Sequence, residues 1–363
     1  MYITYNTCIM NPYIKTNFGN THIELLNLPS LKMLTYTIPK LKGRVRRIGV
    51  DVIRAERSED DIHGTLRALQ SRNRQPKRWL GQHYMVNEQV NSAMVQLAGI
   101  QPGDLILEIG PGTGSLTKFL VEAGAHIIAV EKDQDMAALV AERFAHTNQV
   151  EVVHEDFVKW SVSSQINEAL EQRYRASTTL KRAKVIANLP FNITTQVVKK
   201  LLPLGNTFSH VVLLLQDEAA IRLVDASPDC NEYRPISLLV NFFSVPEYRF
   251  SVGRDSFFPQ PRVDAGVVSF ALKRTSEYPP VASPKAFFTL VNSAFTRKRK
   301  MLRNSLQHLH SSESVQRALS FVGLPETSRP DELTLDQFVA LHNALTQQTA
   351  ALKSNMRLSG KET

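Results

Sequence analysis

Three glycines at alternate positions are the first residues whose type and spacing could serve a chemical purpose. Gly110, Gly112 and Gly114 follow the apolar run 105–109 and precede apolar residues at helical spacing, which predicts a strand, a tight turn and a helix. Glycine allows a positive φ and a close approach of ligand to main chain, and the N–H groups that open the helix attract a polar or anionic group. A turn that merely reverses the chain is the alternative.

Two acids further along the chain favour a ligand site over a simple turn. Glu131 follows a second apolar run, about twenty residues after the glycines, where an open α/β sheet places an acid that holds two ribose hydroxyls. Asp156 follows a third run, where a carboxylate can accept a hydrogen bond from an exocyclic amine. The spacing G-x-G-x-G, preceded by Glu108, is one residue shorter than in the dinucleotide motif. Because the shorter turn leaves less room for a pyrophosphate, these residues indicate S-adenosylmethionine.

The segment with the most specific chemistry is Asn188-Leu189-Pro190-Phe191, directly after the apolar run 184–187. The lone pair of an aromatic amine is delocalised into its ring, so the amine attacks a methyl group poorly. Two acceptors on its hydrogens, the Asn188 side chain and the Leu189 carbonyl, would free that pair. Pro190 fixes the turn, and the ring of Phe191 offers a face on which a base can stack. The alternative is an ordinary turn after a strand, in which the aromatic ring of Phe191 only fills space. The position of the segment beside a nucleoside site disfavours this alternative.

Five cations lie within seven residues near the C-terminal end, with no acid among them: Arg297, Lys298, Arg299, Lys300 and Arg303. The run is predicted at a helix start and is a candidate for contact with a phosphate backbone. A solvated helix face is the alternative. The net charge of +9 is a weaker argument, because residues 1–50 hold seven lysines and arginines against one acid and so contribute +6 of it.

The elements that position these residues follow from the hydrophobic pattern. Apolar runs predict five buried parallel strands with helices between them, at 105–109, 126–130, 150–153, 184–187 and 210–215. Two more strands, 246–252 and 263–272, are predicted to pair around Phe257 and form an antiparallel edge. Helical patterns alone follow, near 285–295, 299–309, 314–321 and 335–345. The sequence therefore predicts an α/β fold, a doubly wound Rossmann-like sheet with a small C-terminal all-α domain.

Composition divides the chain into four expected parts. Residues 1–60 are rich in Asn, Thr and Tyr and poor in acids, which is typical of an organellar transit segment and equally of a disordered extension. We expect a methyltransferase catalytic domain over 61–278, a small helical RNA-binding domain over 279–346 and a disordered tail over 347–363. The two cysteines, Cys8 and Cys230, lack metal-ligand spacing, and no run approaches the roughly 20 apolar residues of a membrane span. We therefore predict neither a metal site nor a membrane partner.

Seven motifs occur in the order and spacing of one known family. They are Leu80-Gly-Gln-His-Tyr-Met, Glu108-Ile-Gly-Pro-Gly-Thr-Gly, Glu131-Lys-Asp, Glu155-Asp156, Asn188-Leu-Pro-Phe, Phe257-Phe-Pro-Gln-Pro-Arg-Val-Asp264 and Phe295-x-x-Lys-Arg-Lys-x-x-Arg-Asn-Ser305. Over residues 65–345 the chain resembles the small-subunit rRNA adenine N6-dimethyltransferases of the bacterial KsgA type. The segment Tyr233-Arg-Pro-Ile236 is similar to the plant plastid branch, which supports the transit interpretation.

The resemblance implies an enzyme that transfers methyl groups from S-adenosylmethionine to the N6 amines of two adjacent adenines near the 3′ end of small-subunit rRNA, in ribosome biogenesis. It assigns cofactor-binding positions to the residues His83, Met85, Gly110, Gly112, Glu131, Asp156 and Asn188. It places 188–191 on the catalytic loop and Phe257 on a second aromatic that clamps the flipped base against Phe191. The family usually has Asn where His83 stands and often has Tyr where Phe191 stands, so the role of His83 stays open.

Binding proteins and other enzymes with the same fold are the alternatives to an rRNA dimethyltransferase. A ribosome-assembly factor or a mitochondrial transcription factor could retain the cofactor site, although the intact 188–191 segment favours the enzyme. A NAD-dependent dehydrogenase is disfavoured by the short glycine spacing. We expect S-adenosylmethionine as cofactor and the rRNA of an immature small ribosomal subunit as partner. We also expect a monomer in the chloroplast stroma, with the mitochondrion as the alternative location.

Overall fold

The computed structural model of the chain describes residues 52–53, 83–175, 181–228 and 230–359, with the backbone alone at 52–53 and 352–359. The predicted transit segment over 1–60 lies outside the described residues except at 52–53. In the described part, no helix is long and apolar enough to cross a membrane.

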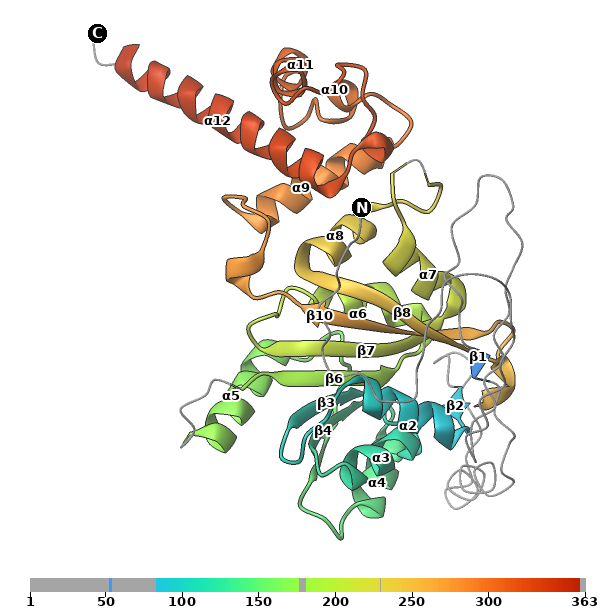
Figure 1. Cartoon of the computed structure of the whole chain (residues 1–363). Helices are drawn as coiled ribbons and strands as arrows, with labels where there is room; N and C mark the ends of the chain where they lie inside the picture. Colours follow the sequence, from blue (N-terminus) through green and yellow to red (C-terminus); the bar gives the residue numbers. More distant parts are fainter. Residues whose placement is uncertain (1–51, 54–82, 176–180, 229, 360–363) are drawn as a thin grey trace, which may run out of the picture.

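An eight-stranded mixed sheet forms the centre of the molecule (Figure 1). Its five parallel strands are β3 (Leu105–Ile109), β4 (His126–Glu131), β5 (Val150–His154), β6 (Ala183–Asn188) and β7 (Phe208–Gln216). They lie in the order β5-β4-β3-β6-β7, so the direction of winding reverses between β3 and β6. Open sheets of this kind bind ligands at such a reversal, beyond the carboxyl ends of the strands.

An antiparallel edge completes the sheet. Strand β10 (Ala265–Leu272) pairs antiparallel with β7, and β8 (Ser244–Val252) pairs antiparallel with β10. The short strand β1 (Val52–Ile53) adds a parallel partner to β8. The predicted doubly wound sheet with an antiparallel edge is confirmed.

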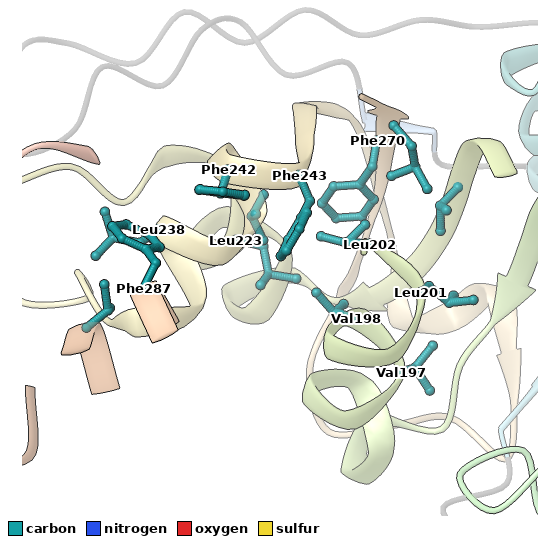
Figure 2. Close-up of a cluster of buried hydrophobic side chains, with 14 of the residues drawn as sticks. Val197, Val198, Leu201, Leu202, Leu223, Leu238, Phe242, Phe243, Phe270 and Phe287 are labelled. Atoms are coloured by element: carbon teal, nitrogen blue, oxygen red, sulfur yellow. The ribbon is translucent and has the colours of Figure 1, made fainter. Parts of the chain in front are cut away.

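Helices cover both faces of the sheet. They are α2 (Glu88–Leu97), α3 (Ser115–Glu122), α4 (Gln134–Arg143), α5 (Val162–Tyr174), α6 (Thr194–Leu201), α7 (Asp217–Asp225) and α8 (Pro235–Phe243). Alternate residues of a strand face opposite sides, so Leu107 packs in one buried cluster and Ile106 in another. Figure 2 shows part of the first cluster, to which α6, α7 and α8 all contribute side chains.

The C-terminal part is helical and lies beyond α8 (Figure 1). It consists of α9 (Pro284–Thr296), α10 (Leu302–Ser305), α11 (Ser312–Phe321) and α12 (Leu335–Ser359). The ring of Phe287 on α9 lies 5.3 Å from that of Phe242 on α8, and the hydroxyl of Tyr233 donates to the carbonyl of Leu333 at 2.8 Å. The helical part and the sheet thus share one hydrophobic core.

Two predictions for this part are wrong. The helix predicted over 299–309 covers only Leu302–Ser305, because Arg297 leaves the helical region and the chain turns to bury Leu302 and Leu306. The cationic run therefore lies mainly in the turn between α9 and α10. The tail over 347–363 is not disordered up to residue 359, because α12 continues to that point. Its Ala350, Ala351 and Leu352 are strong helix formers, which the polar composition around them conceals.

Candidate active site

A cavity of about 270 Å³ lies at the carboxyl ends of β3, β4, β5 and β6, where the winding reverses. Ten of the predicted cofactor-binding and catalytic residues line it: His83, Met85, Gly110, Gly112, Glu131, Asp156, Asn188, Leu189, Pro190 and Phe191. Of the residues predicted for these two roles, Phe257 alone is not among those that line the cavity. The structure thus brings together, from five separate segments, nearly all of the residues that the sequence singled out.

The glycine turn after β3 forms one wall of the cavity. Gly110, Gly112 and Gly114 all have positive φ, at 67°, 57° and 78°. At Gly112 a Cβ would also lie 3.1 Å from the ring of Tyr84, so a side chain would both strain the backbone and push against a buried aromatic. The turn therefore needs glycine at this position in order to keep its main chain against the cavity.

Glu131 lies at the end of β4 and is 8% exposed. One carboxylate oxygen accepts from the amide of Gly112 at 3.2 Å and the other from the amide of Asp133 at 2.9 Å. Burial raises the pKa of Glu131, while these backbone donors act against that shift. Each carboxylate oxygen can accept more than one hydrogen bond, so both can also accept from a pair of ribose hydroxyls.

Asp156 follows β5 and is already engaged on both oxygens. Lys132 lies 2.9 Å from one of them, and the amide of Val158 donates to the other at 3.0 Å. The hydrogen bond from Lys132 lowers the pKa of Asp156. The carboxylate is therefore ionised and fixed at the wall of the cavity, where a free lone pair can accept from an adenine amine.

The orientation of the Asn188 amide is set by one hydrogen bond. Its Nδ2 donates to the backbone carbonyl of His83 at 3.4 Å. A carbonyl oxygen only accepts, so this contact requires the nitrogen on that side and leaves Oδ1 as an acceptor for a ligand. After Asn188, Pro190 has φ −56° and a 3₁₀ turn begins at Phe191, which keeps the segment compact.

Phe257 lies outside the cavity. It belongs to the two-residue strand β9 (Phe257–Phe258), which pairs antiparallel with β2 (Tyr84–Met85). Phe257 is opposite Met85, and both side chains pack in the same buried cluster, so that the Phe257 ring is only 3% exposed. In this arrangement the Phe257 ring has no exposed face beside Phe191, and its role as a clamp for the flipped base stays a prediction.

The ring that faces Phe191 is that of His83. The two ring centroids are 6.1 Å apart and the planes differ by 25°. Nδ1 of His83 lies 2.7 Å from the carbonyl of Pro259, to which it must donate, so the imidazole is held in place. The sequence left the role of His83 open, and the structure makes it the link between the catalytic loop and the segment around Pro259.

The geometry agrees with what comparison of the chain with known proteins shows. Residues 73–347 match the family described as ribosomal RNA adenine dimethylase. The chain belongs to this family. The chloroplastic ribosomal RNA small subunit methyltransferase of Arabidopsis thaliana is 54% identical over 322 residues, which cover 89% of this chain and 93% of that protein. Ribosomal RNA small subunit methyltransferase A of Protochlamydia amoebophila is 36% identical, over 74% of this chain and 91% of its own length.

Solved structures show the same fold in other members of the methyltransferase class. A dimethyladenosine transferase from Plasmodium falciparum superposes with a TM-score of 0.58 at 23% identity, covering 74% of this chain and 98% of that one. The 23S rRNA methyltransferase ErmE superposes with a TM-score of 0.53 at 19% identity, over 72% and 99% of the two chains.

S-adenosylmethionine is the cofactor of the dimethylase family, and the cavity suits it. Asp156, Glu131 and the glycine turn follow three neighbouring strands, in the order β5, β4 and β3. Adenine, ribose and the amino-acid part of the cofactor also follow one another in a row. The two orders match. Asp156 can accept from the adenine amine, Glu131 can accept from the ribose hydroxyls, and the glycine turn lies where the amino-acid part would follow.

Lys200 is a positioning residue that the sequence analysis missed. From α6, its Nζ donates to the carbonyls of Phe157, Val158 and Trp160 at 2.8, 2.7 and 2.6 Å. These carbonyls belong to the loop directly after Asp156. Lys200 therefore ties that loop to the helix that follows the catalytic segment, and no local pattern in the sequence signals such a contact between distant segments.

We expect Lys200→Met to raise the KM for S-adenosylmethionine about tenfold with a smaller change in kcat, because the loop that carries Asp156 loses three charge-assisted hydrogen bonds. Steady-state methylation kinetics would measure both constants. Lys199→Met, at the exposed neighbouring position, is the matched control and should leave the KM unchanged. Equal KM values for the two variants would show that Lys200 does not hold the loop.

Glu108 is a buried acid beside the cavity, 1% exposed, whose carboxylate accepts from the Thr117 hydroxyl at 2.7 Å. Burial raises its pKa from 4.5 to about 8, and the nearby charge of Glu131 adds to the shift. Between these two values the unfolded chain binds fewer protons than the folded protein. The free energy of unfolding therefore falls as the pH rises through this window, by up to roughly 1.4 kcal/mol per pH unit for this group.

We expect Glu108→Gln to remove this dependence. The difference in unfolding free energy between variant and wild type should grow in favour of the variant from about pH 5 to about pH 8 and then level off. Urea denaturation of the cofactor-free protein at several pH values would measure it. Glu122→Gln, at an exposed position on α3, is the control. Parallel curves for Glu108→Gln and wild type would contradict the prediction.

The cationic run divides into two groups. Arg297, Arg299 and Lys300 are exposed, whereas Arg303 is half-buried. Lys298 is engaged within the protein, because its Nζ donates to the carbonyls of Cys230 and Asn231 at 3.4 and 3.3 Å and lies 3.7 Å from the carboxylate of Asp331. Three of the five predicted RNA-binding cations are therefore exposed to a phosphate backbone without such internal partners in the described part.

Proposed function

We propose that the protein dimethylates the N6 amines of two adjacent adenines near the 3′ end of small-subunit rRNA, with S-adenosylmethionine as methyl donor. The observation that carries this proposal is the Asn188 amide, whose Nδ2 donates to the His83 carbonyl and whose Oδ1 remains an acceptor in the cavity that Phe191 also lines. The names of the curated relatives from Arabidopsis and Protochlamydia support the small-subunit rRNA as substrate.

The residues of the loop act on the amine. One amine hydrogen donates to Asn188 Oδ1 and the other to the Leu189 carbonyl, so that the nitrogen lone pair is directed out of the ring plane toward the methyl group. Phe191 holds the adenine by stacking, which contributes about 1–3 kcal/mol. S-adenosylmethionine supplies an electrophilic methyl group when bound. When the new N–C bond forms, the bond between the methyl group and the cofactor sulfur would break, so that S-adenosylhomocysteine leaves and the nitrogen releases one proton to solvent. The second transfer would use the remaining amine hydrogen and a second molecule of S-adenosylmethionine.

We further propose that residues 279–346 form the RNA-binding helical domain and that Arg297, Arg299 and Lys300 contact phosphates. Exposure of these three side chains on one turn and the absence of an acid among them support this assignment. We also propose that the protein acts as a monomer.

The proposal for the activity is tested with immature small subunits isolated from cells that lack the dimethylase. Incubation with labelled S-adenosylmethionine should introduce two methyl groups on each of two neighbouring adenines, located by primer-extension stops. A protein that binds the subunit and the cofactor but transfers no label would be an assembly factor on the same fold. Label on another base would also overturn the proposal.

We propose the chloroplast stroma as the location of the protein, with residues 1–60 as the transit segment. The chloroplastic relative from Arabidopsis, which the chain matches over 93% of its length, supports this location. Residues 1–60 fused to a fluorescent reporter should carry it into plastids. Retention in the cytosol would contradict the proposal, and import into mitochondria would move the function to that organelle.

A further inference from the structure

Asn91 on α2 is a buried polar residue that the mechanism above does not use. Its side chain lines the cofactor cavity, although the residue is only 2% exposed. Its backbone amide takes part in the helix. Its side-chain amide has no hydrogen-bond partner among the described residues, yet its atoms are not among the fully enclosed unpaired ones, so the amide is open to the cavity. An amide that has no protein partner and faces a cavity keeps its donors and its acceptor available for a ligand.

The position of Asn91 indicates which part of the cofactor it would meet. Helix α2 lies beside α3, because Lys118 on α3 forms an ion pair with Glu88 on α2 at 2.8 Å. Asn91 follows Glu88 by three residues and so lies on the same side of α2. Ser115 and Leu116, which open α3 directly after the glycine turn, line the same cavity as Asn91. Asn91 therefore comes from the helix that packs beside α3, at the glycine-turn end of the site.

The chemistry of the amide suits the amino-acid part of the cofactor. That part carries an ammonium group, which needs an acceptor, and a carboxylate, which needs a donor. An asparagine side chain offers both an acceptor oxygen and two N–H donors. We propose that Asn91 is a binding residue for the amino-acid part of S-adenosylmethionine.

Two ligands that differ only at this end test the proposal. S-adenosylhomocysteine carries the amino-acid part, whereas 5′-methylthioadenosine keeps adenine, ribose and sulfur but lacks it. We expect Asn91→Leu, which keeps the branched shape and the number of heavy atoms but removes the polar groups, to weaken binding of S-adenosylhomocysteine about tenfold or more and to leave that of 5′-methylthioadenosine within about twofold. Titration calorimetry on the full chain without RNA would measure both affinities, so the result does not depend on the rRNA substrate.

Asn87 provides the matched control on the same helix. Its side chain caps α2 by accepting from the amides of Gln89 and Val90, and it donates to Ser256. Asn87→Ala should lower the Tm and leave the ratio of the two affinities unchanged. Asn91→Leu should keep or raise the Tm of the ligand-free protein, because no internal hydrogen bond is lost. Unchanged binding of both ligands, or an equal loss for both, would overturn the role of Asn91.

Discussion

Asn188→Ala should reduce the rate of methyl transfer by about 10²–10³ while leaving RNA binding nearly intact. The Asn188 oxygen matters chiefly in the transition state, when the amine gains positive character and donates more strongly. An interaction of that kind lowers the barrier without tightening the ground state. Single-turnover methylation with saturating RNA would measure the rate, and a filter-binding assay would measure the affinity for RNA.

The order in which the monomethyl and dimethyl products appear gives a second test of the role of Asn188. Monomethyladenine keeps one amine hydrogen, so only one of the two acceptors can hold it for the second transfer. A weakened loop should therefore accumulate monomethyladenine before activity is lost. An Asn188→Ala enzyme that dimethylates at nearly the wild-type rate would exclude this mechanism.

Phe191 supplies the matched controls for the catalytic loop. Phe191→Tyr should change the rate little, because the ring face on which the base stacks is retained. Phe191→Ala should lose the stacking contribution of about 1–3 kcal/mol. It should also remove the contact with the His83 ring, whose centroid lies 6.1 Å away.

Replacing Arg297, Arg299 and Lys300 by glutamate in one variant should weaken RNA binding about 10- to 100-fold. The plot of log affinity against log salt, which falls with salt, should become shallower by about 2 to 3 in slope. The reason is that these exposed cations release counterions from phosphates on binding. Binding measured over a range of salt concentrations would give the slope. If the slope is unaffected, the three side chains form a solvated surface with no contact to RNA.

Lys298 is the internal control for this experiment. Because its Nζ lies 3.7 Å from the carboxylate of Asp331, Lys298→Glu would place two negative charges together in a half-buried site. We expect this variant to lose stability, seen as a lower Tm, and to change the salt slope less than the triple variant does. A full loss of slope with no loss of stability would contradict the division of the run into two groups.

The sequence predicts those features that depend on short, regular patterns. The apolar run of β3 and the glycines after it predict both the strand and the wall of the cofactor cavity, and Glu131 and Asp156 follow from the strand ends. The pairing of β2 with β9 was not predictable, because two-residue strands far apart in the sequence carry no periodic signal. For that reason the sequence does not show that Phe257 packs against Met85, nor does it show the contacts of His83 and Lys200.

The common core of the sheet and the C-terminal helices has a consequence for how a target is chosen. Phe242 and Phe287 pack together, and Lys298 bonds to the segment at residues 230–231, so the turn with the exposed cations cannot shift freely relative to the catalytic loop. The separation between an anchored phosphate and the reactive methyl group is then a fixed property of the protein. Among the many adenines of an rRNA, such an enzyme should modify those at the right distance along a folded RNA surface, even though the loop itself recognises little more than one base.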